Sequence, residues 1–99
     1  MVEVHLATPL RPLVRGARVV SAEGRDLREL VNNLEASYPG FKERVLEPDG
    51  SMKVFVNIFV NDEDVGFLKG LETQLKDGDV VSILPAVSGG SERLALEIQ

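Results

Sequence analysis

Apolar and polar residues alternate at the start of the chain, which is typical of a β-strand with one buried face. Residues 2–7 show this pattern clearly, and residues 17–22 form a second short stretch rich in β-branched residues. Pro9 and Pro12 lie between them. We therefore expect two short strands that form an antiparallel hairpin, joined by a long, proline-marked loop.

After Asp26, apolar residues recur every three or four positions instead of every two, which is the period of an amphipathic helix. The residues in this stripe are Leu27, Leu30, Val31, Leu34 and Tyr38. Asp26 followed by Glu29 is typical of a capping box at a helix start, and Pro39-Gly40 is a stop signal. The sequence predicts one main helix lying on a sheet, with short helical turns at 41–46 and 70–75 and an exposed turn at 47–51.

The alternation returns strongly at residues 54–61, VFVNIFVN. One face of this expected strand is apolar, and its members are Val54, Val56, Ile58 and Val60. The other face carries Phe55 and Phe59 between asparagines, so these aromatics are candidates for a partner-docking surface on an open sheet face. A singly exposed apolar residue is also normal in soluble proteins. Residues 61–64 are expected to turn the chain, and residues 65–68 to form a short edge strand.

The last strong strand is residues 80–84, whose branched and apolar side chains are suited to a sheet interior. It follows the turn at 76–79, whose Asp-Gly pair indicates a residue with positive φ. Pro85 has no backbone donor, so we expect regular pairing to weaken beyond it. Gly89 and Gly90 lack a Cβ and can pass through a narrow channel. A Gly-Gly pair alone is weak evidence for such a role and favours a simple loop.

The expected order is strand, strand, helix, strand, short strand, strand, with one main helix covering one face of a mixed sheet. This is a two-layer α+β fold. If the last strand lies beside the first, inside the sheet, the fold is a β-grasp (ubiquitin-like) roll. The pattern alone does not fix that strand order.

Composition narrows the possible functions. The 99 residues fit one domain, 43% of them hydrophobic, without the ~20-residue apolar run of a membrane span. No secretory signal is evident, so a cytoplasmic location is expected. The absence of cysteine excludes thiolate metal sites and thiol nucleophiles on this chain. The net charge of −5 argues against nucleic acid; it suits a basic protein partner, although solubility is the simpler explanation.

Candidate catalytic groups are few, and the chain is not expected to be an enzyme. His5 is the only histidine and has no recognisable nucleophile setting, so we expect it on the surface. The acidic residues 62–64 lack the spacing of a calcium loop and are interpreted as a solvated turn, so no metal is expected. A terminal glycine carboxylate, in contrast, becomes a reactive acyl donor after adenylation. Ser88, Gly89 and Gly90 would supply an unhindered tail that threads into a partner's active site.

Together the helix, the 54–65 strand and turn, and the 76–90 strand with its Gly-Gly ending resemble the ubiquitin-like sulfur-carrier family (MoaD/ThiS type). The specific segments are residues 56–62, VNIFVND, residues 77–79, DGD, and residues 84–90, LPAVSGG. The resemblance covers residues 2–90 and is closest to the actinobacterial carrier that serves a cysteine synthase.

The resemblance implies that Gly90 carries the sulfur. Its carboxylate would be adenylated by an ATP-dependent, ubiquitin-activating-like adenylyltransferase/sulfurtransferase and converted to a thiocarboxylate. It further implies a pyridoxal-phosphate cysteine synthase that accepts the sulfur and a JAMM-type zinc metalloprotease that releases cysteine. ATP, zinc and pyridoxal phosphate would be held by these partners, and none of them by this chain.

One departure from the family pattern is the segment 91–99, SERLALEIQ, which follows Gly90 and blocks its carboxylate. It is a propeptide cut after Gly90, a permanent tail, or a segment added by cloning, and we favour the propeptide. We thus expect a carrier domain at 1–90 and a removable extension at 91–99, whose alternating residues could pair as an edge strand. A protein modifier joined to lysines, a molybdopterin or thiamin carrier, and a pure interaction domain remain alternatives.

Overall fold

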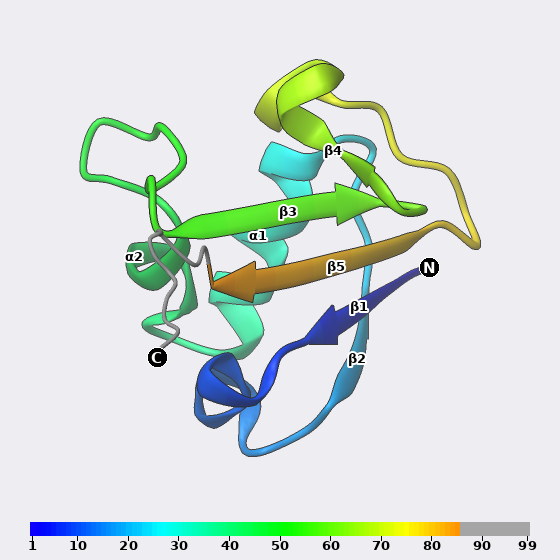
Figure 1. Cartoon of the computed structure of the whole chain (residues 1–99). Helices are drawn as coiled ribbons and strands as arrows, with labels where there is room; N and C mark the ends of the chain where they lie inside the picture. Colours follow the sequence, from blue (N-terminus) through cyan, green and yellow to red (C-terminus); the bar gives the residue numbers. More distant parts are fainter. Residues whose placement is uncertain (86–99) are drawn as a thin grey trace, which may run out of the picture.

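The computed structural model describes residues 1–85, and its elements form one sheet with helices on one side (Figure 1). The strands are β1 (Val2–Leu6), β2 (Val19–Ala22), β3 (Val56–Val60), β4 (Glu63–Asp64) and β5 (Val80–Pro85). The α-helices are α1 (Leu27–Ser37) and α2 (Phe41–Val45), and three 3₁₀ helices are η1 (Thr8–Val14), η2 (Val65–Phe67) and η3 (Gly70–Glu72). No helix among these residues is long and apolar enough to span a membrane.

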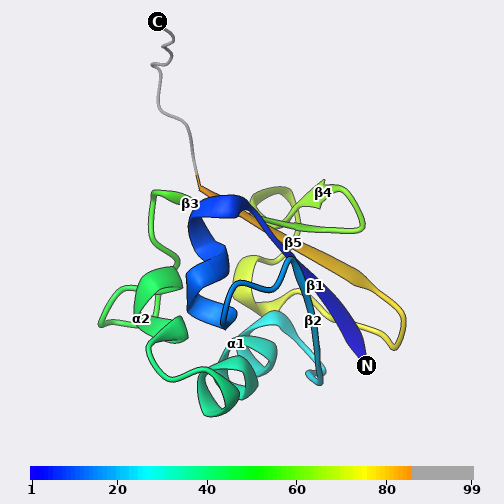
Figure 2. The same cartoon turned by 90° about the horizontal axis from the view of Figure 1, so that it is seen from below.

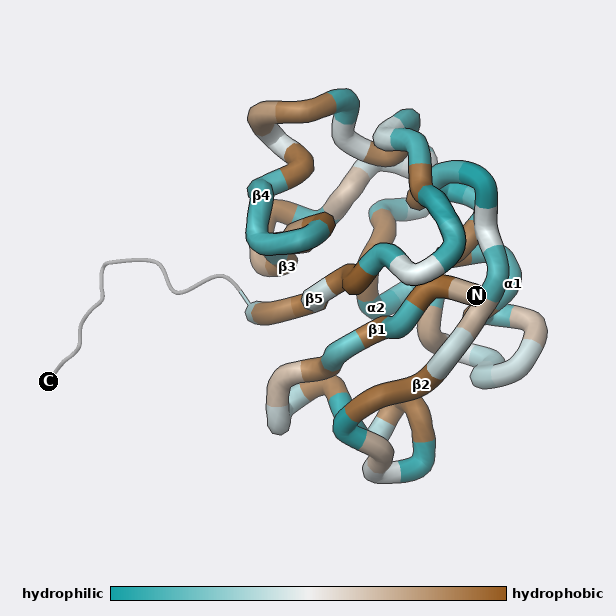
Figure 3. The backbone as a smooth tube through the Cα atoms, turned by 90° about the vertical axis from the view of Figure 1, so that its right-hand side faces the viewer, coloured by the Kyte–Doolittle hydropathy of each residue, from teal (hydrophilic) through white to brown (hydrophobic). Residues whose placement is uncertain are grey.

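Strand β5 lies at the centre of the sheet. The strand order is β2-β1-β5-β3-β4, and Figure 3 shows the strands side by side in this order. β5 is parallel to β1 and antiparallel to β3, while β2 is antiparallel to β1. The last strand therefore pairs with the first, which confirms the α+β fold and its β-grasp arrangement.

The core lies between the sheet and α1. Val4, Val81, Ile58 and Ile83 are fully buried, and the register places Ile83 beside Ile58. Figure 2 shows α1 and α2 on the same side of the sheet. The helix residues that complete the core are Leu27, Leu30, Val31, Leu34, Phe41 and Val45. Burying each large aliphatic side chain contributes about 1.5–3 kcal/mol, so this layer is the main source of stability.

The capping signal predicted for α1 is confirmed. The Asp26 carboxylate accepts a hydrogen bond from the Glu29 N–H at 2.8 Å, and the Glu29 carboxylate accepts one from the Arg25 N–H at 2.6 Å. This backbone bond, with the Arg25 guanidinium, lowers the pKa of Glu29. The contact made by Glu29 is thus with Arg25, the residue before the cap, and not with Asp26 itself. An Asp cap of this kind stabilises the folded state by about 1 kcal/mol.

The prediction of a proline-marked loop between β1 and β2 is wrong. The segment forms η1, which buries Leu10 and Val14 against the core. Pro9 stands in the first turn of η1, where its missing N–H has no intrahelical partner to lose. The second strand consequently begins at Val19, two residues later than expected.

The edge strand predicted at 65–68 is also wrong. Asn61 and Asp62 both have positive φ, 49° and 72°, and two such residues make a tight hairpin turn. The chain therefore returns at once as β4, and the Asp64 carboxylate then accepts the Gly66 N–H at 2.8 Å and starts η2.

Val54 was expected in the core but is 78% exposed. Strand β3 begins only at Val56, and Val54 and Phe55 lie in the turn that precedes it. The alternation of β3 is confirmed from Val56 onward, because Val56, Ile58 and Val60 are all buried.

Candidate functional site

The residues predicted to react or thread, Ser88, Gly89 and Gly90, lie outside the described residues, as does the segment 91–99. The structure does describe the end of the sheet from which this segment continues. Pro85 is the last residue of β5 and pairs with Val56, the first residue of β3. Val54 and Phe55 directly precede that pair, so two exposed apolar side chains stand next to the exit of β5.

The sheet face opposite α1 is open, and its residues follow from the register. One row across the five strands contains Val19, His5, Ser82, Phe59 and Asp64. The next row toward the carboxyl end of β5 pairs Leu84 with Asn57. We call the side chains of these two rows the open face. It combines the apolar residues Val19, Phe59 and Leu84 with polar and charged ones.

The two phenylalanines predicted for docking are both accessible, but to different degrees. Phe55 is 69% exposed in the turn before β3, whereas Phe59 is half-buried within the open face. Partner docking at these residues stays a prediction. Leu84, which sequence reasoning assigned to the sheet interior, is 38% exposed and joins them. The signal for it was available, because inward-facing Val81 and Ile83 place Leu84 on the opposite face.

The other end of β5 is held by a network of polar contacts around Asn61. Its side-chain oxygen accepts the Val80 N–H at 2.9 Å, and its amide donates to the Asp79 carboxylate at 3.0 Å. Asp79 also accepts the Lys76 N–H at 2.8 Å. These bonds lower the pKa of Asp79, the Asn61 contact being the largest cause. The amino terminus contacts Asp77 in the same turn, where Gly78 has the predicted positive φ of 92°.

His5 lies on the open face and is half-buried. Its Nε2 is 2.8 Å from a Glu3 carboxylate oxygen, a contact between neighbours on one strand. The acidic residues 62–64 form the turn and the β4 strand. Within residues 1–85, no group of three or more His, Asp or Glu side chains is arranged to hold a metal ion.

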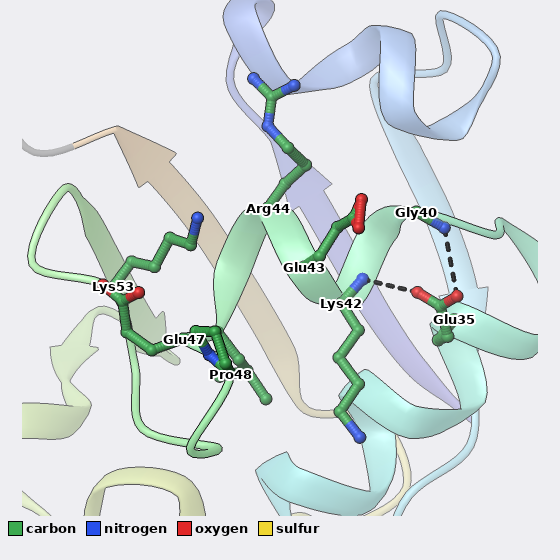
Figure 4. A pocket seen from close by; sticks show the side chains of 9 residues that line it. Glu35, Gly40, Lys42, Glu43, Arg44, Glu47, Pro48 and Lys53 are labelled. Atoms are coloured by element: carbon green, nitrogen blue, oxygen red, sulfur yellow. Dashed lines mark hydrogen bonds between the residues drawn. The ribbon is translucent and has the colours of Figure 1, made fainter.

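A hollow of about 840 Å³ lies beside α2 (Figure 4). Its wall carries charges of both signs, including Glu35, Lys42, Arg44 and Lys53. The Glu35 carboxylate accepts the N–H groups of Gly40 and Lys42 at 3.1 and 2.8 Å, which lowers its pKa. Glu35 therefore fixes the start of α2, and the mixed charges favour no particular class of ligand.

Comparison with known proteins gives a consistent result. The model of the ThiS family matches residues 4–90. The sulfur carrier protein CysO of Mycobacterium tuberculosis is 50% identical over 91 residues, covering 90% of this chain and 98% of that protein. Its crystal structure superposes with a TM-score of 0.84 at 49% identity, covering 88% of this chain and all of that chain.

Two further solved structures extend this likeness. CysO in a BexX/CysO complex from Amycolatopsis orientalis has a TM-score of 0.84 at 41% identity, covering 91% of this chain and 100% of that one. Small archaeal modifier protein 1 of Methanosarcina acetivorans has a TM-score of 0.77 at 33% identity, covering 90% and 95% of the two chains. The likeness spans the whole described body.

Proposed function

Because the chain belongs to the ThiS family of ubiquitin-like proteins, we propose that it is a sulfur carrier for cysteine biosynthesis and that Gly90 is its reacting residue. The observation that supports this most is the extent of the likeness. Half of the aligned residues are identical to the mycobacterial sulfur carrier, and the family match runs through to Gly90. The relatives are carriers and not catalysts, so this chain would be a substrate of other enzymes.

The proposed chemistry takes place in two steps at the Gly90 carboxyl group. A carboxylate oxygen attacks the α-phosphorus of ATP in an adenylating partner, forming an acyl-adenylate and releasing pyrophosphate. A sulfide-equivalent nucleophile then attacks the acyl carbon and AMP leaves, which gives the thiocarboxylate. Both steps are substitutions without net oxidation or reduction of the carboxyl carbon. A chain without cysteine can carry sulfur in this way.

The other partners follow from the same proposal. The thiocarboxylate sulfur takes the place of the leaving group on the β-carbon of an activated serine derivative held by a pyridoxal-phosphate synthase, which gives a thioester. The acyl group then moves from sulfur to the amine, so that cysteine is joined to Gly90 by a peptide bond, and a JAMM-type zinc protease would hydrolyse this bond to release cysteine. ATP, pyridoxal phosphate and zinc belong to these partners, which act together with the carrier in the cytoplasm. That a CysO has been crystallised in a complex supports the idea that carriers of this kind work by docking to a second protein.

The extension 91–99 must be removed before the first step, because Gly90 has no free carboxylate while Ser91 follows it. We propose cleavage after Gly90. The family match supports this boundary, since it ends at residue 90.

The intact mass of the protein isolated from its native host tests the proposal. We expect a mass for residues 1–90, together with a form heavier by the difference between one sulfur and one oxygen. Only the uncut mass under cysteine-limited growth would contradict the carrier function, and an interaction domain would then be the better interpretation.

A second function, protein modification, is favoured by one observation. The archaeal relatives of similar fold include small archaeal modifier proteins, one of them 44% identical over 62 residues. In this route the activated Gly90 is transferred to a lysine amine and forms an isopeptide bond. Mass spectrometry of trypsin-digested conjugates distinguishes the routes. Trypsin cuts after Lys76 and leaves residues 77–90 on a modified lysine, whereas a dedicated sulfur carrier leaves no such remnant.

A further inference from the structure

A recess of about 320 Å³ lies between η1 and β5 at the edge of the open face, and its charge is opposite to that of the molecule. Its wall includes Arg11 and Arg18 and contains no carboxylate. The whole chain carries a net charge of −5, with 16 acidic residues against 11 basic ones. A hollow with only cationic charge on such a chain is suited to an anionic group. We call it the arginine recess.

The backbone holds both arginines in place. The Arg11 Nε donates to the Leu6 carbonyl at 3.0 Å, in a partly buried contact that ties η1 to the end of β1. The Arg18 carbonyl accepts the Leu6 N–H at 2.9 Å, so the hairpin ladder positions Arg18 next to the same residue. The Arg11 guanidinium and the Arg18 backbone are thus both bonded to Leu6 of β1.

The rest of the recess is apolar or neutral. Val19 and Leu84 also line it and are 41% and 38% exposed, with Ser82 and His5 between them in the register. The nearest acid on this strand, Glu3, contacts His5 and does not line the recess. An occupant therefore meets two cations and two exposed aliphatic side chains together.

The recess lies next to the part of the chain that the proposed reaction uses. Leu84 is the residue before Pro85, where β5 ends, and Gly90 follows six positions after Leu84. Because an extended chain spans at most about 3.5 Å per residue, Gly90 is within about 20 Å of this wall. A protein that receives the tail in its active site can also reach the recess.

We propose that the arginine recess is a docking site for an acidic loop of the adenylating partner, with a carboxylate side chain between Arg11 and Arg18 and a neighbouring apolar side chain on Leu84 and Val19. This inference rests on the proposed function. A planar guanidinium binds carboxylate through paired N–H donors, which makes arginine well suited to such a contact. Complementary charge at an interface also accelerates association and rejects wrong partners.

Two measurements test the inference, both with the adenylating partner. Steady-state adenylation of the chain ending at Gly90 gives KM and kcat, and binding of the full chain gives Kd. Arg18→Glu reverses one charge of the recess at an exposed side chain. Its matched control is Arg25→Glu, which makes the same change in net charge at a 90% exposed side chain outside the recess. We expect Arg18→Glu to raise KM and Kd at least about tenfold with kcat unchanged, because reversing a close charge across an interface has effects of this size.

Two further measurements separate docking from misfolding and from general charge. Leu84→Ser, at a position that is 38% exposed, should also raise KM, and its Tm should stay well above the assay temperature. The dependence of KM on salt concentration should be weaker for Arg18→Glu than for the wild type and Arg25→Glu. Equal KM values for Arg18→Glu and Arg25→Glu, with normal activation of the wild type, would overturn the inference and leave the proposed function intact.

If the wild type itself is not adenylated at Gly90, the proposed function fails and this inference fails with it. If inorganic pyrophosphate binds the isolated chain and Arg18→Glu abolishes that binding, the recess is a site for a free phosphate and the protein-docking inference is wrong.

Discussion

The two ends of β5 differ in how the rest of the molecule holds them. At Val80, the Asn61 side chain forms hydrogen bonds with the Val80 N–H and with the Asp79 carboxylate. The amino terminus contacts the same region. At Pro85, the flanking residues Val54, Phe55 and Leu84 are exposed and apolar. One end is thus satisfied by internal contacts, whereas the other presents surface that a partner can bury.

This difference separates stability from function along a single strand. Substitutions at the Val80 end should lower the free energy of unfolding and leave partner binding unchanged. Substitutions at the Pro85 end should weaken partner binding and leave the free energy of unfolding unchanged. Each of the following predictions tests this division, and the largest expected effect comes first.

Gly90→Ala, in a chain ending at residue 90, should lower the rate of ATP-dependent pyrophosphate release by about 100-fold, since small misplacements of a reacting group have effects of this size. The free energy of unfolding should not change, because the core of the described residues 1–85 does not include Gly90. Ser88→Ala is the matched control and should lower the rate far less. A similar loss from both variants would show that Gly90 has no special role.

Asn61→Ala should lower the free energy of unfolding by about 2 kcal/mol in urea denaturation, because two hydrogen bonds are lost and alanine is strained at positive φ. Asn61→Gly loses the same bonds without the strain and should be destabilised less. KM for the adenylating partner should stay at the wild-type value for both. A raised KM would place function at this end too.

Phe55→Ser should change the free energy of unfolding by no more than about 0.5 kcal/mol, as expected for an exposed residue. The same variant should raise KM for the partner about fivefold, the effect of losing an average interface side chain. Phe59→Ser, at a half-buried position, should lower both stability and affinity. If Phe55→Ser binds like the wild type, the exposed end of β5 docks through other residues.

The smallest effect concerns pH. Hydrogen bonds hold the pKa of Asp79 below its ordinary value of 3.8 in the folded chain, so its contribution to stability is fully present above that pH. It is lost as the pH falls toward the folded-state pKa. Asp79→Asn should therefore be less stable than the wild type at pH 6, and the gap should narrow below pH 3.8. A constant gap in urea midpoints would contradict this assignment.

Much of the described fold follows from local sequence signals. Three features each depend on a few residues that are close in sequence: the apolar stripe of α1, the Asp26 cap and the Asp77-Gly78 turn. All three are confirmed. The position of β5 between β1 and β3 is a long-range property, which the resemblance to a family supplied and the strand pattern did not. The described residues end at Pro85, so the role of Ser88, Gly89 and Gly90 stays a prediction.

The errors have a common physical cause. Residues 65–68 and Val54 are apolar residues next to the strand pattern of β3. In both places the backbone turns, after β3 in the first case and before β3 in the second. Positive φ at Asn61 and Asp62 shortens the hairpin, and a turn before β3 exposes Val54. In η1, the prolines indicated a loop, although Leu10 and Val14 are spaced four apart and both become buried. Net charge gave no sign of the arginine recess, because η1 brings Arg11 to it and the pairing of β1 with β2 and β5 brings the other residues.

The central place of β5 has a mechanical consequence. Under the proposed function, a partner would draw the tail into its active site. A pull along the axis of β5 would act on a strand that is bonded on both sides, to β1 and to β3 (Figure 1). Such a pull loads the two ladders in shear, so many hydrogen bonds share the force at once instead of opening singly as in a zipper. The chain beyond Pro85 thus continues from a strand that is bonded on both sides, so the folded domain can resist such a force while the terminus reacts.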